Sequence, residues 1–128
     1  MLPISVKESP GKGRGVFARK NFKKGEIIET CPALVFPAEE VDAFESTQLN
    51  NYYFAWGAAS KEAAIALGYG SLYNHSYTPN ATYQKDFNNK ILKYICIRDI
   101  KENEEITINY NWDPEDKTPV WFAVASQE

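Results

Sequence analysis

The chain is divided into short β-prone segments by clusters of glycine, proline and asparagine. Turn signals recur every ~8–12 residues, for example at 9–15, 21–26, 86–89 and 101–104. Such spacing leaves little room for long helices and is typical of several small sheets joined by tight turns. The sequence therefore predicts a mostly β domain.

Residues rich in Val, Ile, Phe, Tyr and Thr mark the expected strands. We expect them at 4–7, 16–18, 27–31, 33–36, 81–85, 90–98 and 106–110. The segment 91–97 is almost continuously apolar, which predicts a central strand, and the turn at 86–89 predicts a hairpin with 81–85. Residues 106–110 alternate, with Ile106, Ile108 and Tyr110 on one face.

Two segments have helical character. Residues 37–45 carry acidic side chains in the first turn and predict a short helix; those acids either compensate the helix dipole or attract a basic substrate. Residues 58–67 favour a helix by propensity. They lead directly into Gly68-Tyr69-Gly70, however, so a short strand remains an alternative.

Length and composition limit the class of protein. With 128 residues the chain is expected to form one domain, and a net charge of −3 argues against nucleic acid as a partner. Cys31 and Cys96 are far apart and indicate two reduced core thiols, and one histidine leaves no sensible metal site. The absence of a signal-like or membrane-spanning apolar run predicts a soluble, intracellular protein, cytoplasmic by default with a nuclear or host-cell location left open.

Two loops carry the candidate binding residues. The segment 74–80 (NHSYTPN) contains the chain's single histidine and suits either a plain Asx/Pro turn or a fixed loop that bonds a ligand. Gly11, Gly13 and Gly15 form either an ordinary turn or a loop that a ligand approaches closely. The pattern of a phosphate-binding loop is absent.

Three stretches in order resemble one known family: GKGRGVFA at 11–18, GYGSLYNHSYTPNA at 68–81 and NEEITINY at 103–110. Together they resemble the SET-domain protein-lysine methyltransferases, most closely the minimal stand-alone SET proteins of viruses and bacteria. The resemblance covers almost the whole chain. It implies a SET fold of several small β-sheets with short helices and a C-terminal pseudoknot.

The resemblance also implies an activity. S-adenosyl-L-methionine would donate a methyl group to a lysine side chain of a protein or peptide, possibly a histone or another basic protein, leaving S-adenosyl-L-homocysteine and requiring no metal. The sulfonium of the donor is already activated, so such an enzyme mainly aligns and desolvates the amine. Tyrosine walls would favour the neutral amine, and no dedicated base is required.

Position by position, the resemblance places Tyr110 at the active-site tyrosine. Tyr52, with Tyr53 as an alternative one residue away, and Tyr83 would shape the lysine channel, and Trp112 would complete both the channel and the cofactor site. The remaining cofactor contacts would come from Lys12, Gly13, Arg14, the Asn74 side chain, the His75 backbone and Tyr110.

The chain also departs from the family pattern. Ser71 stands where many members have arginine, Asn103 replaces a glycine, and Ile108-Asn109-Tyr110 replaces the common Y-D-Y. A cysteine-rich zinc cluster after the domain is absent. We therefore expect one domain over 1–128, with a core at 1–110 and an aromatic cap at 111–128 that includes Trp112, Trp121 and Phe122.

Other interpretations stay open on the sequence alone. Without the resemblance, Tyr110 is an ordinary tyrosine at a strand end, and Trp112 and Trp121 cap a core. The chain could also be a non-catalytic module that binds a peptide or cofactor, or an interaction domain whose motifs only maintain the pseudoknot. A homodimer formed through 37–56 and the aromatic tail is a further possibility.

Overall fold

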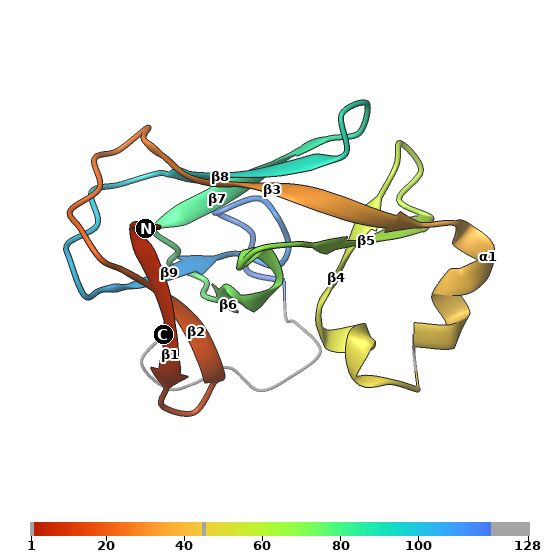
Figure 1. Ribbon diagram of the computed structural model, residues 1–128, viewed down its shortest axis with the longest axis horizontal. Coiled ribbons are helices and arrows are strands. Elements are labelled where there is room, and N and C mark those ends of the chain that lie inside the picture. Colours follow the sequence, from red (N-terminus) through yellow and green to blue (C-terminus); the bar gives the residue numbers. More distant parts are fainter. Residues whose placement is uncertain (1, 45, 119–128) are drawn as a thin grey trace.

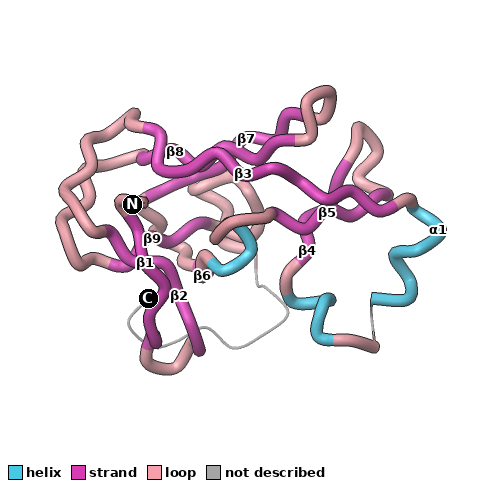
Figure 2. Tube along the Cα trace, viewed as in Figure 1, coloured by secondary structure: helices cyan, strands magenta, loops and turns pink. Residues whose placement is uncertain are grey.

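The computed structural model describes residues 2–44 and 46–118, which form two β-sheets with short helical turns (Figures 1 and 2). A four-stranded sheet has the order β1-β2-β9-β6 and a five-stranded sheet has the order β4-β5-β3-β8-β7. The strands are β1 (Ile4–Ser9), β2 (Gly13–Ala18), β3 (Ile27–Phe36), β4 (Tyr53–Trp56), β5 (Glu62–Ala66), β6 (Asn74–His75), β7 (Ala81–Asp86), β8 (Ile91–Cys96) and β9 (Glu105–Ile108). The helical turns are α1 (Ala38–Val41), η1 (Asp42–Phe44), η2 (Gln48–Asn51) and η3 (Gly70–Leu72).

Strand β3 connects the two halves of the five-stranded sheet. Its first part, 27–32, pairs with β8, and its second part, 33–36, pairs with β5 (Figure 1). The two strands that were expected at 27–31 and 33–36 are therefore a single strand of ten residues. Pro32 lies where β3 changes partner, and such irregular positions tolerate a residue without an N–H.

Residues 62–66 form strand β5, which settles the alternative left open for 58–67 in favour of a strand. Helix propensity is high in this segment, but burial of its side chains determines the strand conformation. Ala63 and Ala64 are fully buried between β4 and β3, where small side chains allow close packing. The expected helix at 37–45 is present as the single turn α1 followed by the 3₁₀ turn η1.

The predicted hairpin is confirmed, with β7 and β8 pairing from Ala81↔Cys96 to Asp86↔Ile91. Strand β8 is central, as expected, but only alternate residues are fully buried: Leu92, Tyr94 and Cys96. These belong to the one hydrophobic core found in the described residues, which joins both sheets. Cys31 and Cys96 are buried free thiols, and burial raises the pKa of the Cys96 thiol to about 11.

The small sheet brings the two polar motifs together. The two-residue strand β6 pairs in parallel with β9, so that Asn74 lies opposite Thr107 and His75 opposite Ile108. The Asn80 side chain strengthens this contact: its amide nitrogen donates to the Glu105 carbonyl at 2.9 Å, and its oxygen accepts from the Thr107 N–H at 2.9 Å. The segments 74–80 and 105–110 are thus bound along one another, as the expected pseudoknot requires.

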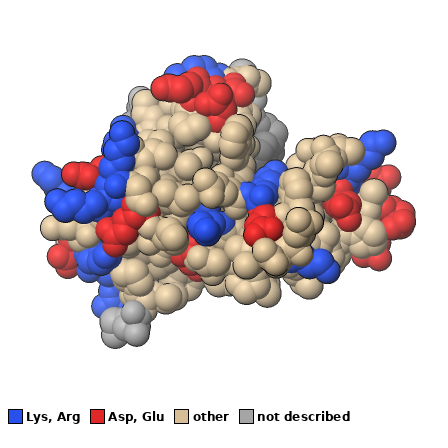
Figure 3. Space-filling model, turned by 90° about the horizontal axis from the view of Figure 1, so that it is seen from above, with Lys and Arg blue, Asp and Glu red and all other residues tan. Residues whose placement is uncertain are grey.

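The surface is mixed in charge. On the face shown in Figure 3, acidic and basic side chains are interspersed among uncharged residues rather than gathered into a continuous basic area. None of the helices in the described residues is long and apolar enough to span a membrane.

Candidate active site

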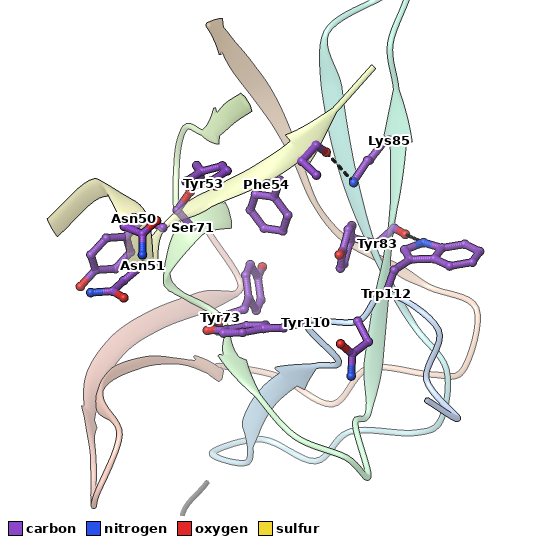
Figure 4. A pocket seen from close by; sticks show the side chains of 13 residues that line it. Asn50, Asn51, Tyr53, Phe54, Ser71, Tyr73, Tyr83, Lys85, Tyr110 and Trp112 are labelled. Carbon is purple, nitrogen blue, oxygen red and sulfur yellow. Dashed lines mark hydrogen bonds between the residues drawn. The ribbon is translucent and has the colours of Figure 1, made fainter. Parts of the chain in front are cut away.

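A cavity of about 420 Å³ lies between β4, β7 and the segment that follows β9 (Figure 4). We call it the tyrosine pocket, because five tyrosines line it. The lining residues are Asn50, Asn51, Tyr52, Tyr53, Phe54, Ala55, Ser71, Tyr73, Tyr83, Lys85, Tyr110, Asn111 and Trp112. The structure therefore brings Tyr52, Tyr83, Tyr110 and Trp112 to one cavity, although they are as much as 60 positions apart in the sequence.

Tyr110 is held at both ends. Its hydroxyl donates to the Tyr73 carbonyl at 2.8 Å, and its backbone N–H donates to Nδ1 of His75 at 3.0 Å. Burial, followed by the proximity of Tyr52, raises the pKa of Tyr110 far above its ordinary value. The phenol therefore remains neutral and can act as a hydrogen-bond donor at any physiological pH.

Tyr83 forms a wall of the pocket. Its ring packs edge-on against Phe54, with the ring centroids 5.1 Å apart, and the residue is only 3% exposed. Burial raises the pKa of Tyr83 to about 12, so this hydroxyl is also neutral. Within the described part of the chain the Tyr83 hydroxyl has no hydrogen-bond partner, which leaves it available to a polar group that enters the pocket.

Tyr53, the alternative to Tyr52 in the sequence prediction, also lines the pocket. Its ring contacts Phe44 edge-on, with the centroids 5.6 Å apart, whereas Tyr52 is close enough to affect the pKa of Tyr110. Both Tyr52 and Tyr53 therefore line the pocket, and Tyr53 also packs against Phe44.

The sequence analysis missed Tyr73. This side chain is 1% exposed, its ring stacks on Tyr94 with a centroid distance of 4.3 Å, and its hydroxyl donates to Oε1 of Glu29 at 2.8 Å. Burial, followed by the negative charge of Glu29, raises the pKa of Tyr73 well above its ordinary value. Its position directly before Asn74 of the NHS motif is the sequence feature that could have identified it as a pocket residue.

Ser71, which stands in place of the family's frequent arginine, also lies in the lining. Its hydroxyl accepts a hydrogen bond from the Ala66 N–H at 3.1 Å. Serine therefore serves here to connect η3 to β5, and the pocket has one cation fewer than the family pattern suggests.

The residues expected to contact the cofactor gather beside the pocket, around Glu105. The Asn74 amide nitrogen donates to Oε2 of Glu105 at 2.7 Å and to the Arg14 carbonyl at 3.1 Å. Ser9 donates to Oε1 of Glu105 at 2.7 Å, and the Lys12 ammonium lies 3.9 Å from the same oxygen. Glu105 is therefore the centre of a network that joins β1, β2, β6 and β9, a role that the sequence analysis did not assign.

Gly15 makes this network possible. A Cβ atom at Gly15 would lie 2.3 Å from Oε2 of Glu105 and 2.6 Å from the Asn74 amide nitrogen. Only a residue without a side chain allows the two polar groups to meet against β2. Gly13 differs, because its φ of +76° favours glycine while the space beside it is open.

His75 is 2% exposed and supports Tyr110 through its ring. Because Nδ1 accepts the Tyr110 N–H, the neutral imidazole carries its proton on Nε2. The ring therefore has a positioning role toward Tyr110, whereas the resemblance implied a contact of the His75 backbone with the cofactor.

The segment after β9 closes one side of the pocket. The Trp112 indole N–H donates to the Tyr83 carbonyl at 2.8 Å, and Trp112 remains 54% exposed. Thr118 accepts hydrogen bonds through its carbonyl from the Tyr77 hydroxyl and the Asn111 side chain. Residues 111–118 are thus attached to the NHS loop, while Trp121 and Phe122, which were also expected in the cap, lie outside the described residues.

This arrangement fits a cofactor with an amino-acid end and a positively charged sulfonium. Open space beside Gly13 leaves the backbone of the β1–β2 turn accessible, and the Glu105 carboxylate supplies negative charge nearby. Within residues 2–44 and 46–118, no group of three or more His, Cys, Asp or Glu side chains could hold a metal ion.

Comparison with known proteins matches the SET domain family model to residues 13–111. A histone-lysine N-methyltransferase of Schizosaccharomyces pombe, specific for H3 lysine-37, is 38% identical over 109 residues, which is 84% of this chain and 73% of the relative. A variant-silencing SET domain-containing protein of Plasmodium falciparum is 28% identical over 124 residues, which is 86% of this chain but 5% of that protein.

Solved structures agree. The crystal structure of a candidate histone methyltransferase of Plasmodium falciparum superposes with a TM-score of 0.70 at 32% identity, over 86% of this chain and 94% of that one. Two structures of Polycomb Repressive Complex 2 give TM-scores of 0.70 and 0.71: a humanized mutant of the Chaetomium thermophilum complex with the inhibitor GSK126, and ctPRC2 in an autoinhibited conformation with S-adenosylmethionine. They cover 85% of this chain and 15% of theirs at 19% and 20% identity, and so show a shared fold.

The chain belongs to the SET-domain family. The expected fold and the expected class of enzyme, a protein-lysine methyltransferase that uses S-adenosylmethionine, are confirmed by these matches. The tyrosine pocket and the Glu105 network lie within the matched range, apart from Ser9, Lys12 and Trp112 at its ends.

Proposed function

We propose that the tyrosine pocket receives the target lysine and that Tyr110 orients its amine for methyl transfer, with a histone or another basic protein as the substrate. The observation that carries this assignment is a cavity lined by five tyrosines, with no carboxylate or histidine side chain among the described residues of its wall. Such walls disfavour a charged amine by desolvation and attract a methylated ammonium through their ring faces. The relative that acts on histone H3 makes histones the first substrates to test.

Each residue then has a defined role. Tyr110 stays protonated, and its hydroxyl and the Tyr73 carbonyl mark the floor where the amine is aligned. Tyr52 and Tyr83 bound the channel and limit the number of methyl groups that fit, and Trp112 closes the side next to Tyr83. The ammonium transfers its proton to bulk water as it enters the pocket, so no dedicated base is needed.

S-adenosylmethionine supplies the activated methyl group. Lys12, Gly13 and Arg14 would hold its amino-acid end through backbone groups, and Asn74 and the His75 backbone would complete the site. Asn74 and Arg14 are already connected by a hydrogen bond, and Lys12 lies beside Glu105, so these groups form one surface. Displacement at the methyl carbon is in line, so this surface and the pocket must hold donor and amine on one axis.

We also propose that residues 1–128 act as one SET unit, with 111–128 as the cap of the site. The hydrogen bonds of Asn111, Trp112 and Thr118 support this division for the described part of the cap. We further propose a homodimer through 37–56, supported by the exposure of Leu49 in this segment, at 42%. Size-exclusion chromatography with light scattering decides it, because a monomer at all concentrations contradicts a dimer.

The function is tested by transfer of a radiolabelled methyl group from S-adenosylmethionine to core histones and to a basic-protein mixture. Mass spectrometry then locates the lysine and counts its methyl groups. We expect labelling of lysine that disappears with Tyr110→Phe. A protein that binds S-adenosylmethionine but labels no lysine would instead be a non-catalytic binding module.

A further inference from the structure

Lys85 is the one charged side chain among the thirteen described residues that line the tyrosine pocket. It comes from β7, and Figure 4 shows it at one end of the lining side chains, with Tyr73 and Tyr110 at the other end in this view. A cation in a cavity that would accept a lysine is unexpected, because like charges repel. Its placement therefore needs a reason other than attraction of the target amine.

The ammonium of Lys85 bridges two sheet edges. Its Nζ donates to the Ala55 carbonyl on β4 at 2.6 Å, and β4 and β7 are the two edge strands of the five-stranded sheet. The same Nζ lies 6.0 Å from the centroid of the Tyr83 ring. The bond therefore crosses the space beside the pocket from one edge strand to the other.

This cation has only neutral partners. No carboxylate lies within 4.0 Å of Nζ in the described residues, and partial burial lowers the pKa of Lys85. A partly desolvated ammonium that is bonded to a single carbonyl is stabilised more by a carboxylate than by a neutral acceptor. Hydrogen bonds that involve ionised groups are about twice as strong as those between neutral groups. Residues 2–44 and 46–118 do not supply that carboxylate.

We propose that Lys85 selects among substrate lysines, favouring those with an Asp or Glu two residues away and disfavouring those with Lys or Arg there. This inference rests on the proposed function, since it assumes that the target lysine enters the tyrosine pocket. It assigns Lys85 as a specificity-determining residue for the same reaction.

The two-residue spacing follows from strand geometry. Edge strands present unpaired backbone groups, and an extended peptide can add to them. In an extended peptide, side chains two positions apart point to the same side, roughly 6–7 Å apart, whereas immediate neighbours point the other way. A side chain two residues from the target lysine thus points to the same side of the peptide as that lysine, toward the part of the tyrosine pocket that Lys85 lines.

Local and overall charge then act differently. The net charge of −3 and the acidic side chains Glu39, Glu40 and Asp42 around α1 attract basic proteins in general. At the pocket the single positive charge discriminates between individual lysines of such a protein. A lysine surrounded by other basic residues is therefore disfavoured.

The test is a series of peptides with one lysine and Glu, Gln or Arg placed two residues before or after it. We expect kcat/KM to fall in the order Glu, Gln, Arg, by about fivefold at each step, the range of a partly exposed ion pair. The same substitutions placed one residue from the lysine serve as an internal control and should have a smaller effect.

Variants of the enzyme complete the test. Lys85→Glu should reverse the order, so that the Arg peptide becomes the best substrate, and Lys85→Arg should preserve it. Lys101→Glu, at an exposed lysine outside the pocket lining, gives the same change in net charge and should leave the order unchanged. Because each result is a ratio within one variant, a general loss of activity does not obscure it.

Dissociation constants for the same peptides, measured by fluorescence anisotropy, separate this inference from the proposed function. Turnover with equal kcat/KM for all three peptides, or an unchanged order in Lys85→Glu, contradicts the role of Lys85 alone. Binding in the expected order without any methyl transfer contradicts the proposed function and leaves the role of Lys85 standing.

Discussion

The backbone N–H of Tyr110 donates to Nδ1 of the buried His75 ring at 3.0 Å, which ties the end of β9 to β6. Tyr110 is thereby placed by a side chain 35 positions earlier in the chain. The same residue also donates through its hydroxyl to the Tyr73 carbonyl, so the 68–81 motif holds the candidate catalytic tyrosine at both ends.

This bond gives the first prediction. His75→Leu removes the ring nitrogen that accepts from the half-buried Tyr110 N–H and should reduce the free energy of unfolding by about 1–3 kcal/mol. His75→Asn keeps an acceptor close to the position of Nδ1 and should lose less stability and less methyl transfer. Denaturant unfolding and kcat are the measurements, and equal losses in the two variants would contradict a role for the ring nitrogen.

Tyr110→Phe removes only the hydroxyl that donates to the Tyr73 carbonyl. We expect methyl transfer to fall by about 100-fold or more, a typical cost of removing one aligned hydrogen-bonding group, with little change in the affinity for S-adenosylmethionine. The raised pKa keeps this phenol neutral through the working range. The loss should therefore be the same from pH 7 to 9, which a pH series of the variant and the parent enzyme checks.

The raised pKa of Tyr83 predicts how stability depends on pH. Its folded-state pKa of about 12 exceeds the ordinary value of 10.0, so the folded protein holds this proton more tightly. The corresponding stability is fully present below pH 10 and is lost as the pH rises toward 12. Tyr83→Phe should show a smaller fall in unfolding free energy across this window, by up to about 2–3 kcal/mol.

Gly15→Ala tests whether the Glu105 network, rather than backbone strain alone, determines the affinity for S-adenosylmethionine. The added Cβ would meet Glu105 and Asn74 at distances below 3.0 Å, so these side chains must move apart. We expect the dissociation constant for S-adenosylmethionine to rise about tenfold or more, by calorimetry, because the candidate cofactor surface is displaced.

Gly25→Ala is the matched control for that prediction. Gly25 has a φ of +89° and open space beside it, in the turn before β3, so alanine introduces strain without a collision. It should lower stability by about 1 kcal/mol while leaving cofactor affinity unchanged. Equal effects of the two variants on affinity would exclude a specific role of the Glu105 network.

Much of the strand pattern was predictable because it depends on local chemistry. Turn residues and β-branched segments located the β7–β8 hairpin, the central strand β8 and most of β3. Helix propensity was misleading at 62–66, where the burial of Ala63 and Ala64 between two strands decides the conformation. Local preference is a weak term when tertiary packing opposes it.

By itself, the sequence determined the family: three ordered motifs identified a SET domain, and two of them contain the candidate site residues Asn74 and Tyr110. Only the tertiary structure decided that the His75 ring supports Tyr110, that Glu105 joins Asn74 to Ser9, and that Lys85 reaches the edge of β4. These contacts join residues 30 to 96 positions apart. Motifs record which side chains are present, whereas pairing across sheets and edges depends on how the whole chain packs.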